Sequence, residues 1–481
     1  MKAKWLPISA AVALALGSVS ASAVDFHGYL RSGLNYATQG GDAYCDGTGG
    51  ADGHMLGRLA DECDTFAEIS LSQEVFNKNN NKFTVNTLVS YGTEEGHWDH
   101  QGNNWQGLNG GSGSAWDGQR MSLREAWAGY EMPSGIQLWA GKRYYQRKDI
   151  HIMDYYYLNN SGTGFGVENI DTGLGAVSVA IIKQQTTYDW TSGDSDGDKD
   201  RNSWKLDARW SGIPLWTDGS LDIAMIYAWQ NLSESQKKEF SKTTPAHFEF
   251  NSETGEIEPK EKKIDPKGKN DRSANNGYLA MIEWTQGNFF GGFNKLSFTY
   301  GHDAFNAGGN HVGDTVIPYS QKGNTFRFID WGVIEQPSWN LGYAFIWTHR
   351  NIFNENETEG GANWTGVTGT DFNFVLRPSY KWSDFTSTVL EFGYYNFSNN
   401  DKLKDDDGNV IRPIVVKHGD HRKRATKLTL AQQWTPGSQF WARPSIRVFA
   451  SWLSGNAYDH FFDDKNDSHQ ITLGAQVEAW W

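Results

Sequence analysis

The segment from residue 142 to residue 162, KRYYQRKDIHIMDYYYLNNSG, gathers charged side chains of both signs among tyrosine rings. Its arginines donate hydrogen bonds, its aspartates accept them, and its tyrosine rings offer flat apolar faces. This combination suits a polyhydroxylated ligand, because each hydroxyl group both donates and accepts. The competing interpretation is a solvated loop with interfacial tyrosines, since charge-rich loops are common on protein surfaces.

The run that precedes this segment, from Ile136 to Gly141, alternates apolar and polar residues and predicts a strand. The charged segment therefore begins where a strand leaves a sheet, and it continues as a loop. Within it, Asp149 and Asp154 could also serve as the acid–base pair of a glycosidase. Nothing in the sequence sets the separation of these two carboxylates, and no second catalytic signature accompanies them. We therefore expect ligand binding and no enzymatic activity.

The first 23 residues are typical of a secretory signal peptide. Lys2 and Lys4 form a basic start, an apolar run extends from Ala10 to Leu16, and Ala21-Ser22-Ala23 forms a small-residue cleavage site. Residues 24–481 are then predicted to form one exported domain. The two cysteines, Cys45 and Cys63, both lie in the exported part, where an oxidising compartment favours one disulfide that closes a loop.

The composition separates two classes of exported protein. The formal net charge of -14 disfavours nucleic-acid binding. After the signal peptide, no apolar run approaches the roughly 20 residues of a membrane helix. Aromatic residues make up 14% of the chain, with 22 tryptophans, and 53 glycines against 12 prolines fit many strands and turns. A transmembrane β-barrel with aromatic girdles explains this excess, and a soluble carbohydrate-binding sandwich is the alternative.

Alternation of apolar and polar residues predicts strands along most of the mature chain. In the terminal strand from His469 to Trp481, every second residue is apolar and faces lipid, whereas Thr472, Gln476 and Glu478 face inward. The other predicted strands lie near residues 26–34, 66–75, 83–91, 123–130, 136–141, 175–182, 206–210, 221–229, 293–300, 325–334, 339–347, 372–380, 386–395, 427–434 and 441–448. Residues 166–171 are expected to turn into the strand at 175–182, and residues 231–277 are the longest polar stretch. Later connections alternate between short (335–338, 382–385) and long (348–371, 398–425), as in an outer-membrane barrel with tight periplasmic turns.

Five aromatic residues interrupt the pattern. Tyr29, Phe66, Phe293, Trp441 and Trp480 lie in the polar, inward phase of their predicted strands. Flat rings stack against the C–H faces of pyranose units, and charged neighbours bind the hydroxyl groups at the edges. A row of such rings would let a sugar chain slide with little change in energy. Alternatively, these rings pack against loops that fold into the barrel.

Several motifs resemble the maltoporin (LamB-type) family of trimeric outer-membrane sugar porins. They are VDFHGYLRSG, LGRLADECDTFAE, LWAGKRYYQRKDIHIMDYYY, GFNK, LAQQW, FWARPSIRVFA and the terminal GAQVEAWW, and together they span nearly the whole mature chain. The resemblance implies an all-β fold: an 18-stranded antiparallel transmembrane β-barrel whose third loop folds inward as a constriction. It also implies a homotrimer in the outer membrane of a Gram-negative bacterium, in contact with lipid, that passes maltose and maltodextrins.

Carried over by motif, the resemblance implies an aromatic slide and a polar track. The slide would comprise Tyr29, Phe66, Trp98, Phe293, Trp441 and Trp480, with Trp98 supplied by a neighbouring subunit and Trp105 as its rival. The family usually has tyrosine where this chain has Phe66, so a hydroxyl group is lost there. The polar track and constriction would comprise Arg31, Arg58, Glu68, Arg124, Arg147, Asp149, His151, Asp154 and Tyr156.

Some alternatives stay open at this point. A sucrose or general oligosaccharide porin would share the architecture, although the sucrose-specific relatives carry a long extension before the barrel. No cofactor is expected. The acidic run DSDGDKD within residues 188–203 is predicted to be a solvated loop, because its glycine is misplaced for a calcium-binding EF-hand and no helices flank it; adventitious binding of calcium or magnesium is the alternative. The divergent outer loops leave phage or other surface ligands undetermined.

Overall fold

The computed structural model describes residues 24–40, 43, 54–93, 119–186, 201–231, 247–251, 256–260, 276–305, 321–354, 363–404, 422–455 and 469–481. The predicted signal peptide lies outside these residues. Within them, no helix is long and apolar enough to cross a membrane. Two short 3-10 helices occur among the described residues, η3 (His151–Met153) and η4 (Asp303–Phe305).

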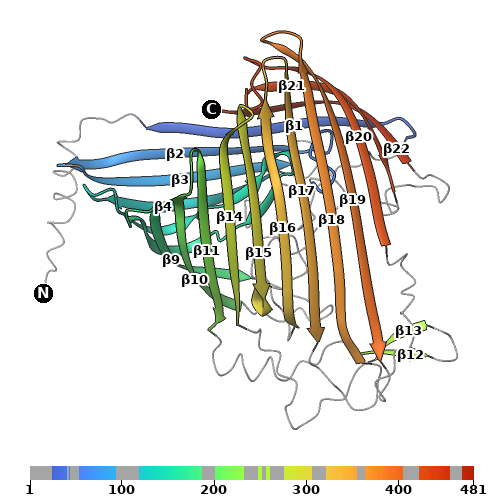
Figure 1. Ribbon diagram of the computed structural model, residues 1–481, viewed down its shortest axis with the longest axis horizontal. Coiled ribbons are helices and arrows are strands. Elements are labelled where there is room, and N and C mark those ends of the chain that lie inside the picture. Colours follow the sequence, from blue (N-terminus) through green and yellow to red (C-terminus); the bar gives the residue numbers. More distant parts are fainter. Residues whose placement is uncertain are drawn as a thin grey trace, which may run out of the picture.

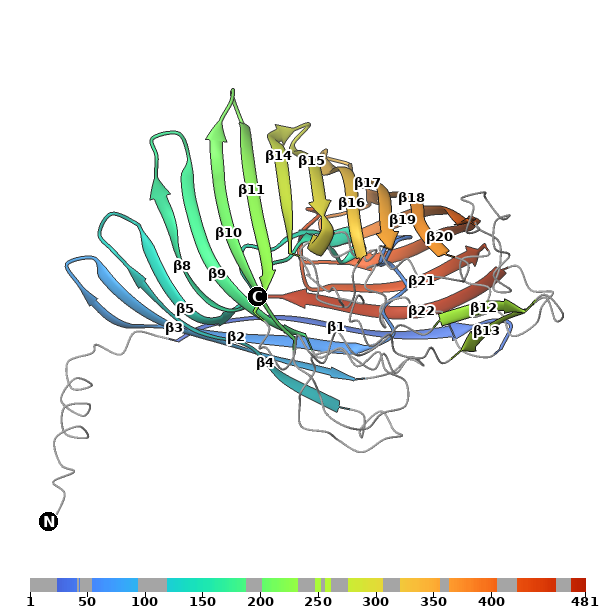
Figure 2. The same ribbon diagram turned by 90° about the horizontal axis from the view of Figure 1, so that it is seen from below.

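One 18-stranded antiparallel sheet dominates the molecule, and it closes on itself because its first strand pairs with its last. The strands lie side by side around the barrel (Figures 1 and 2). They are β1 (Asp25–Ala37), β2 (Thr65–Lys78), β3 (Asn81–Thr93), β4 (Gln119–Glu131), β5 (Gln137–Arg143), β8 (Gly162–Asp171), β9 (Ala176–Thr186), β10 (Arg201–Pro214), β11 (Gly219–Gln230), β14 (Gly277–Phe289), β15 (Gly292–His302), β16 (Gln321–Glu335), β17 (Trp339–Asn354), β18 (Asn363–Lys381), β19 (Thr386–Lys404), β20 (Arg422–Trp434), β21 (Ser445–Ser454) and β22 (His469–Trp480). The predicted 18-stranded barrel is confirmed.

The two ends of the barrel differ in the length of their connections. At one end, which we call the short-turn end, the strands are joined by residues 79–80, 132–136, 172–175, 215–218, 290–291, 336–338, 382–385 and 435–444. The opposite, long-loop end carries the remaining connections. A small hairpin of β12 (His247–Asn251) and β13 (Glu256–Lys260) lies beyond that end (Figure 1). This asymmetry is typical of outer-membrane barrels.

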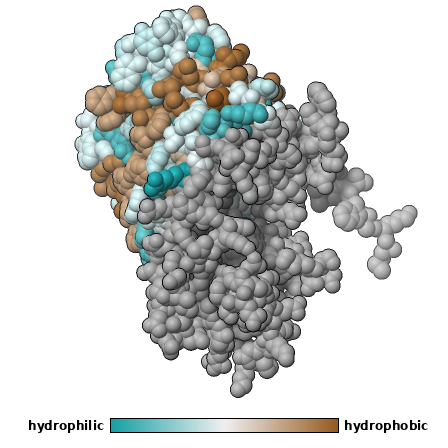
Figure 3. Space-filling model, turned by 90° about the vertical axis from the view of Figure 1, so that its right-hand side faces the viewer, coloured by the Kyte–Doolittle hydropathy of each residue, from teal (hydrophilic) through white to brown (hydrophobic). Residues whose placement is uncertain are grey.

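The predicted phase of the strands agrees with the exposure of their side chains. In β1, Leu34 and Tyr36 are exposed whereas Arg31 is buried, and in β22 Ile471 is exposed whereas Glu478 is buried. Large apolar side chains point outward from nearly every strand, and part of this apolar surface is visible in Figure 3. Such an outward apolar surface is what a barrel presents to lipid.

Three predictions about individual segments are wrong. Residues 166–171, expected to turn, belong to strand β8, and strand β14 was not predicted at all. In β14, inward Leu279 and outward Ile282 are both apolar, so the strand shows no alternation. Trp441 lies in the turn before β21 and not in a strand, because β21 begins only at Ser445.

Two segments of the chain fold into the barrel. The first, which we call L1, comprises residues 54–64 of the connection between β1 and β2, and most of its residues are buried. The second, L3, comprises residues 144–161 between β5 and β8, and contains β6 (Lys148–Ile150), η3 and β7 (Tyr155–Leu158). The family resemblance implied an inward third loop, but nothing in the sequence analysis indicated that L1 also folds inward.

Candidate functional site

L3 packs against one side of the barrel wall, which we call the apolar bank. This bank consists of inward residues of β11, β14, β16, β17 and β18, and L3 covers it with a row of buried apolar side chains. The bank residues are Ala224, Ile226, Leu279, Met281, Ile329, Ala344, Ile346 and Val375; the L3 residues are Ile150, Ile152, Met153, Tyr155, Tyr157 and Leu158. Because the bank is apolar on its inner face, it holds L3 by burial of apolar area.

Charged contacts fix the same loop to the apolar bank. The Lys148 ammonium group lies 2.6 Å from a carboxylate oxygen of Asp222 and 2.7 Å from one of Glu283. The Tyr157 hydroxyl group donates a hydrogen bond to the other carboxylate oxygen of Glu283. Glu283 is fully buried, so its charge is stable only because these donors surround it.

L1 is fixed to the wall formed by β18, β19 and β20. The Lys427 ammonium group, which is fully buried, lies 2.7 Å from Asp61 and 3.5 Å from Glu391, and donates to the backbone oxygens of Gly57 and Leu59. Glu391 in turn accepts a hydrogen bond from Arg377. A cluster of buried charged side chains therefore holds L1 against this wall. Removal of one charged group from the cluster would leave its partner buried without a counter-charge.

The opposite side of the lumen carries four of the six predicted slide residues, which we call the aromatic bank: Tyr29, Phe66, Trp441 and Trp480. The rings of Tyr29 and Phe66 lie 6.2 Å apart, and those of Trp441 and Trp480 lie 6.5 Å apart, between centroids. Strand pairing places Tyr29 opposite Trp480 where β1 meets β22, so the two pairs are neighbours. All four side chains are partly exposed.

The rings of the aromatic bank also contact the inner loops, so the alternative role that the sequence left open is present too. The His151 ring lies 5.4 Å from the Trp441 ring and 5.3 Å from the Trp480 ring. Arg58 of L1 donates a hydrogen bond to the Tyr29 hydroxyl group. These contacts are with polar groups of L1 and L3.

Three arginines and a histidine on this side of the lumen contact one carboxylate, that of Glu478 on β22. Its oxygens lie 3.2 Å from Arg58, 2.8 Å from Arg443 and 3.3 Å from Arg447. The His151 Nε2 atom lies 3.4 Å from the same carboxylate. Burial lowers the pKa of His151, and only part of this effect is offset by Glu478.

Arg31 and Arg58, predicted as part of an open polar track, are buried in an ion-pair network. Arg31 lies 3.1 Å from Glu62, 3.0 Å from Asp64 and 3.0 Å from Asp154, and Arg58 also contacts Glu62. Burial would raise the pKa of Asp154, but the Arg58 and Arg31 charges hold it below its ordinary value. The network joins L1 to the tip of L3.

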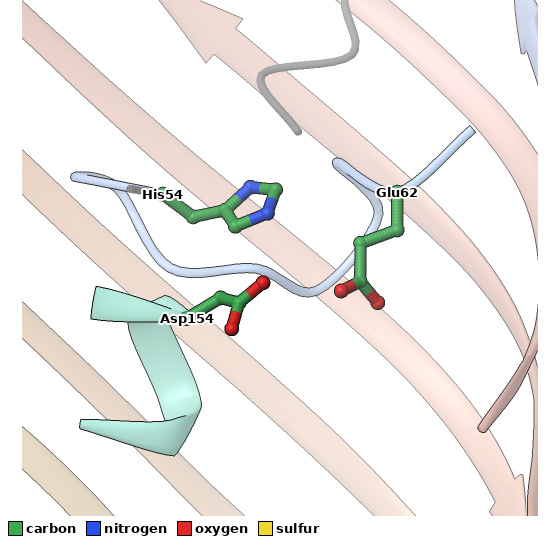
Figure 4. A group of neighbouring side chains, drawn as sticks. All are labelled: His54, Glu62 and Asp154. Carbon is green, nitrogen blue, oxygen red and sulfur yellow. The ribbon is translucent and has the colours of Figure 1, made fainter. Parts of the chain in front are cut away.

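One cluster in this network resembles a metal site. His54, Glu62 and Asp154 point toward one another (Figure 4), and their candidate ligand atoms lie within 4.8 Å of one another. However, both carboxylates already pair with Arg31, which brings a positive charge to the same place. A metal ion would have to overcome the repulsion of this guanidinium group.

The predicted constriction residues Arg147 and Tyr156 lie together. The Arg147 guanidinium carbon is 3.5 Å from the centroid of the Tyr144 ring and 4.5 Å from that of Tyr156. The Tyr144 hydroxyl group donates to Glu68 over 2.9 Å, which links L3 to β2. Burial raises the pKa of Tyr156, so its hydroxyl group stays protonated. Arg124 is farther along the wall, on β4, and donates to Ser90.

Asp149 and Phe293 lie toward the apolar bank. Asp149 lines a hollow of about 310 Å³ between L3 and the wall, and burial raises its pKa above the ordinary value. Phe293, on β15, packs edge-on against Trp331 at 5.0 Å. Phe293 also packs against the apolar cluster that holds L3, so it lies beside the apolar bank.

Three predicted residues cannot be placed. Trp98, its rival Trp105 and Cys45 lie outside the described residues. Cys63 is buried at the end of L1 and is disulfide-bonded. The role of Trp98 as a residue contributed by a neighbouring subunit stays a prediction.

Sequence reasoning missed several residues on which the site depends. Glu478 was assigned to the lumen, but nothing in the strand pattern indicated that several arginines and a histidine meet there. The anchors of L1, Asp61 and Lys427, come from segments that are far apart in the sequence and share no periodicity. Trp331 lies in the inward phase of its predicted strand. This phase could have identified it as a further aromatic residue that faces the lumen.

Comparison with known proteins identifies relatives over nearly the whole chain. A family model described as "LamB porin" matches residues 24–481. A protein named "Maltoporin" from Hahella chejuensis (strain KCTC 2396) is 32% identical over 489 residues, which cover 99% of this chain and 98% of that protein.

Solved structures show weaker similarity. Acinetobacter baumannii OccAB1 matches with a TM-score of 0.46 at 10% identity, over 95% of this chain and 96% of that chain. The trimer form of OmpT, an outer membrane protein of Vibrio cholerae, matches with a TM-score of 0.38 at 13% identity, over 95% of this chain and 99% of that chain. These two values are too low to carry an argument.

Proposed function

The chain belongs to the LamB porin family, and from this premise we propose that it conducts maltose and maltodextrins by facilitated diffusion along the aromatic bank. It is a sugar porin, a multi-pass β-barrel of the Gram-negative outer membrane, and not an enzyme of the glycosidase class. The short-turn end is then the periplasmic end. The maltodextrin substrate, the path along the aromatic bank and the homotrimeric assembly are parts of this proposal.

The observation that carries the proposal is the row of four partly exposed rings, two of which are flanked by charged groups. Phe66 and Trp480 each carry a guanidinium group over the ring: Arg31 at 5.2 Å and Arg443 at 4.1 Å from the centroid. A pyranose ring presents an apolar C–H face and an equatorial rim of hydroxyl groups, so it can stack on the rings and bind these charges at once.

L3 supplies the selectivity of the path in this proposal. Tyr144, Arg147 and Tyr156 form a stack whose guanidinium group has aromatic faces on two sides. This stack narrows the lumen next to the aromatic bank, so a sugar chain would pass in single file. Transport of this kind is passive and needs no cofactor. We also propose a homotrimer, in line with the family, with Trp98 of a neighbouring subunit completing the slide.

A sucrose or general oligosaccharide porin of the same architecture is the second candidate. Phe66 favours neither candidate, because its ring has a stacking face but no hydroxyl group for a specific hydrogen bond. A linear chain of glucose units can occupy a row of rings along its length. Every unit of maltose and of a maltodextrin is a glucopyranose that can stack on a ring, whereas sucrose has one such unit, because its other unit is a fructofuranose.

Liposome swelling tests the proposal directly. Proteoliposomes are diluted into isotonic maltose, maltotriose or sucrose, and the initial swelling rates are compared. We expect maltose and maltotriose to enter several-fold faster than sucrose, because only they follow the aromatic bank. Equal rates for all three sugars would establish the general oligosaccharide porin, and faster sucrose entry would establish the sucrose porin.

A further inference from the structure

Three polar side chains form a cluster on the mostly apolar outer face of the barrel. They are Asn294 on β15, Asp330 on β16 and Tyr343 on β17. Asp330 lies between Ile329 and Trp331, which both pack inside the barrel. Because successive residues of a strand point to opposite faces, the Asp330 carboxylate points outward. Charged groups on this face are costly, because it is the face that a barrel presents to lipid.

One amide group links the three side chains. The Asn294 Nδ2 atom donates a hydrogen bond to Asp330 Oδ1 over 2.7 Å and another to the Tyr343 hydroxyl oxygen over 2.7 Å. Gly332, which is also in the outward phase, leaves space for this arrangement, because a Cβ atom there would lie 2.8 Å from the Tyr343 hydroxyl oxygen. Asn294 is buried, whereas Asp330 and Tyr343 are partly exposed. The cluster therefore presents a carboxylate and a phenol outward on a buried amide.

Asp330 and Tyr343 keep bonding capacity for a ligand. Asp330 uses one carboxylate oxygen for Asn294, and among the described residues it pairs with no lysine, arginine or histidine. The Tyr343 oxygen accepts the hydrogen bond from Asn294, so its own hydroxyl hydrogen is left to donate, and the described part of the chain supplies no acceptor for it. A complementary ligand therefore offers a cationic donor to the carboxylate and an acceptor to the phenol.

The cluster lies close to the short-turn end. Asn294 is the third residue of β15 and Tyr343 is the fifth residue of β17, both counted from that end. At about 3.3 Å per residue along tilted strands, this places the cluster about 10 Å from the turns. Another outward polar pair lies at the same level: Thr388, the third residue of β19, donates a hydrogen bond to Gln432 of β20 over 2.9 Å. The cluster is therefore at the periplasmic boundary of the hydrocarbon layer, where lipid headgroups begin.

Apolar side chains surround the cluster on the outer face. Strand pairing places Leu296 on one side of Asp330 and Phe345 on the other. At the nearby turns, Phe290 and Trp339 are exposed. The acyl chains of a lipid can pack on these side chains while its headgroup meets the cluster. The surroundings therefore match an amphiphile better than a soluble ligand.

We propose that Asp330 and Tyr343 bind the headgroup of a phospholipid of the periplasmic leaflet that carries a primary ammonium group. The ammonium group pairs with the Asp330 carboxylate, and a phosphate or ester oxygen of the same lipid accepts the hydrogen bond from Tyr343. The carboxylate repels anionic headgroups, and a quaternary ammonium group has no N–H to donate. A lysine of another membrane protein offers the same cation, but the apolar surface around the cluster favours lipid. The site lies outside the lumen and does not depend on the proposed function.

Native mass spectrometry of the purified protein tests the site. The protein is mixed with equal amounts of phosphatidylethanolamine and phosphatidylcholine that have identical acyl chains, and the amounts of each lipid bound are compared. We expect the parent to prefer phosphatidylethanolamine about five-fold, the upper range for a partly exposed ion pair. Asp330→Asn should lose this preference, because the amide keeps the shape but not the charge. Tyr343→Phe should bind less of both lipids and keep the preference, because both carry phosphate and ester oxygens.

Asp384→Asn is the matched control, since Asp384 is exposed in a turn at the same end of the barrel. It should keep the preference of the parent, and the circular dichroism spectra of all three variants should match that of the parent. Equal binding of the two lipids by the parent, or a preference that persists in Asp330→Asn, would refute the site. Stronger binding of phosphatidylglycerol than of phosphatidylethanolamine would show that the charge assignment is wrong. If neither lipid is preferred and the parent forms larger oligomers that Asp330→Asn loses, the cluster contacts protein and not lipid.

Discussion

The two sides of the lumen hold the inner loops by different interactions: apolar packing on one side and contacts with polar groups on the other. The apolar bank holds L3 through close-packed apolar side chains, and Lys148 and Tyr157 of L3 add polar contacts with Glu283 of the wall. The aromatic bank meets the same loop through an imidazole ring, and meets L1 through a guanidinium group. The close-packed apolar side chains have no face open to a ligand, whereas a partly exposed ring with polar neighbours keeps a face that a sugar can cover.

This difference shows how to interpret inward residues of a wet barrel. An aliphatic residue in the inward phase marks a wall that a loop covers, as at Ile329 and Val375. An aromatic residue in that phase marks a ligand path only where it stays partly exposed. Partial exposure is not sufficient, because Phe293 is partly exposed as Tyr29 is, and yet it packs against the apolar cluster that holds L3.

The largest effect should come from the aromatic bank's central carboxylate. Glu478→Gln would leave Arg58, Arg443 and Arg447 without their shared counter-charge in a buried place. We expect a loss of about 3–5 kcal/mol in the free energy of unfolding, as for other broken buried ion pairs. The thermal unfolding midpoint in detergent, followed by circular dichroism, measures it.

The control for this variant is Glu131→Gln, which removes a carboxylate from the exposed ion pair with Lys82. Its effect should be close to zero, because exposed ion pairs contribute little. A shift of the Glu478→Gln midpoint no greater than that of the control would mean that the aromatic bank does not depend on its charged network.

The apolar bank should respond next. Met153→Ala removes a fully buried side chain that packs L3 onto the wall, at a cost of about 2–4 kcal/mol in the docking of that loop. Hydrogen exchange of residues 148–158 should accelerate, and the single-channel current should become noisier as L3 moves.

Met225→Ala is the matched control for that change, since Met225 is 61% exposed on the outer face of β11. It should leave both the exchange and the current unchanged. Unaltered exchange in Met153→Ala would show that L3 is held by its ion pairs alone.

A smaller effect should appear in the pH dependence of sugar binding. Burial raises the pKa of Asp149, so this carboxylate takes up a proton at a pH above the ordinary aspartate range, near 3.9. The hydrogen bonds that the carboxylate accepts from a sugar are therefore present at neutral pH and lost as the pH falls through the raised pKa.

The expected loss for the parent is about three-fold in the affinity for maltohexaose. Asp149→Asn should show the lower affinity at all pH values, with no step in this window. Burial lowers the pKa of His151 toward the same pH window, so Asp149→Asn is the variant that separates the two groups. A step of equal size in Asp149→Asn would assign the titration to another group.

The smallest effect is expected from reduction of the disulfide at Cys63. L1 is already held by Lys427 and Arg31, and the barrel is held by its ladder of strand hydrogen bonds. Reduction should change the affinity for maltotriose by less than about two-fold. Both the affinity and the unfolding midpoint are compared before and after reduction, and a large drop in either would mean that the disulfide, and not the ion pairs, holds L1.

Much of the fold was predictable because lipid and water impose alternation on a barrel strand. The exceptions have a physical cause. β14 has apolar residues on both faces, since L3 covers its inner face, and β8 is rich in glycine and has an irregular register near Val167. Alternation cannot reveal either strand, and only the family resemblance gave the full number.

The candidate site was predictable only in part. The alternation of apolar and polar residues along the strands was enough to place Tyr29, Phe66 and Trp480 toward the lumen. It could not show that Arg31 and Arg58 are buried in ion pairs, because those pairs join L1, L3 and the strands β1 and β22, which are distant in the sequence. Trp441 reaches the row from a turn, where no alternation exists to orient it.

Block of the single-channel current by maltotriose tests the central claim most directly, which is that the rings of the aromatic bank bind sugar in the lumen. Trp480→Ala should weaken the block about ten-fold, because it removes one stacking face. Trp382→Ala, a 64% exposed residue in a turn at the short-turn end, should leave the block unchanged. An unchanged affinity in Trp480→Ala would contradict the account.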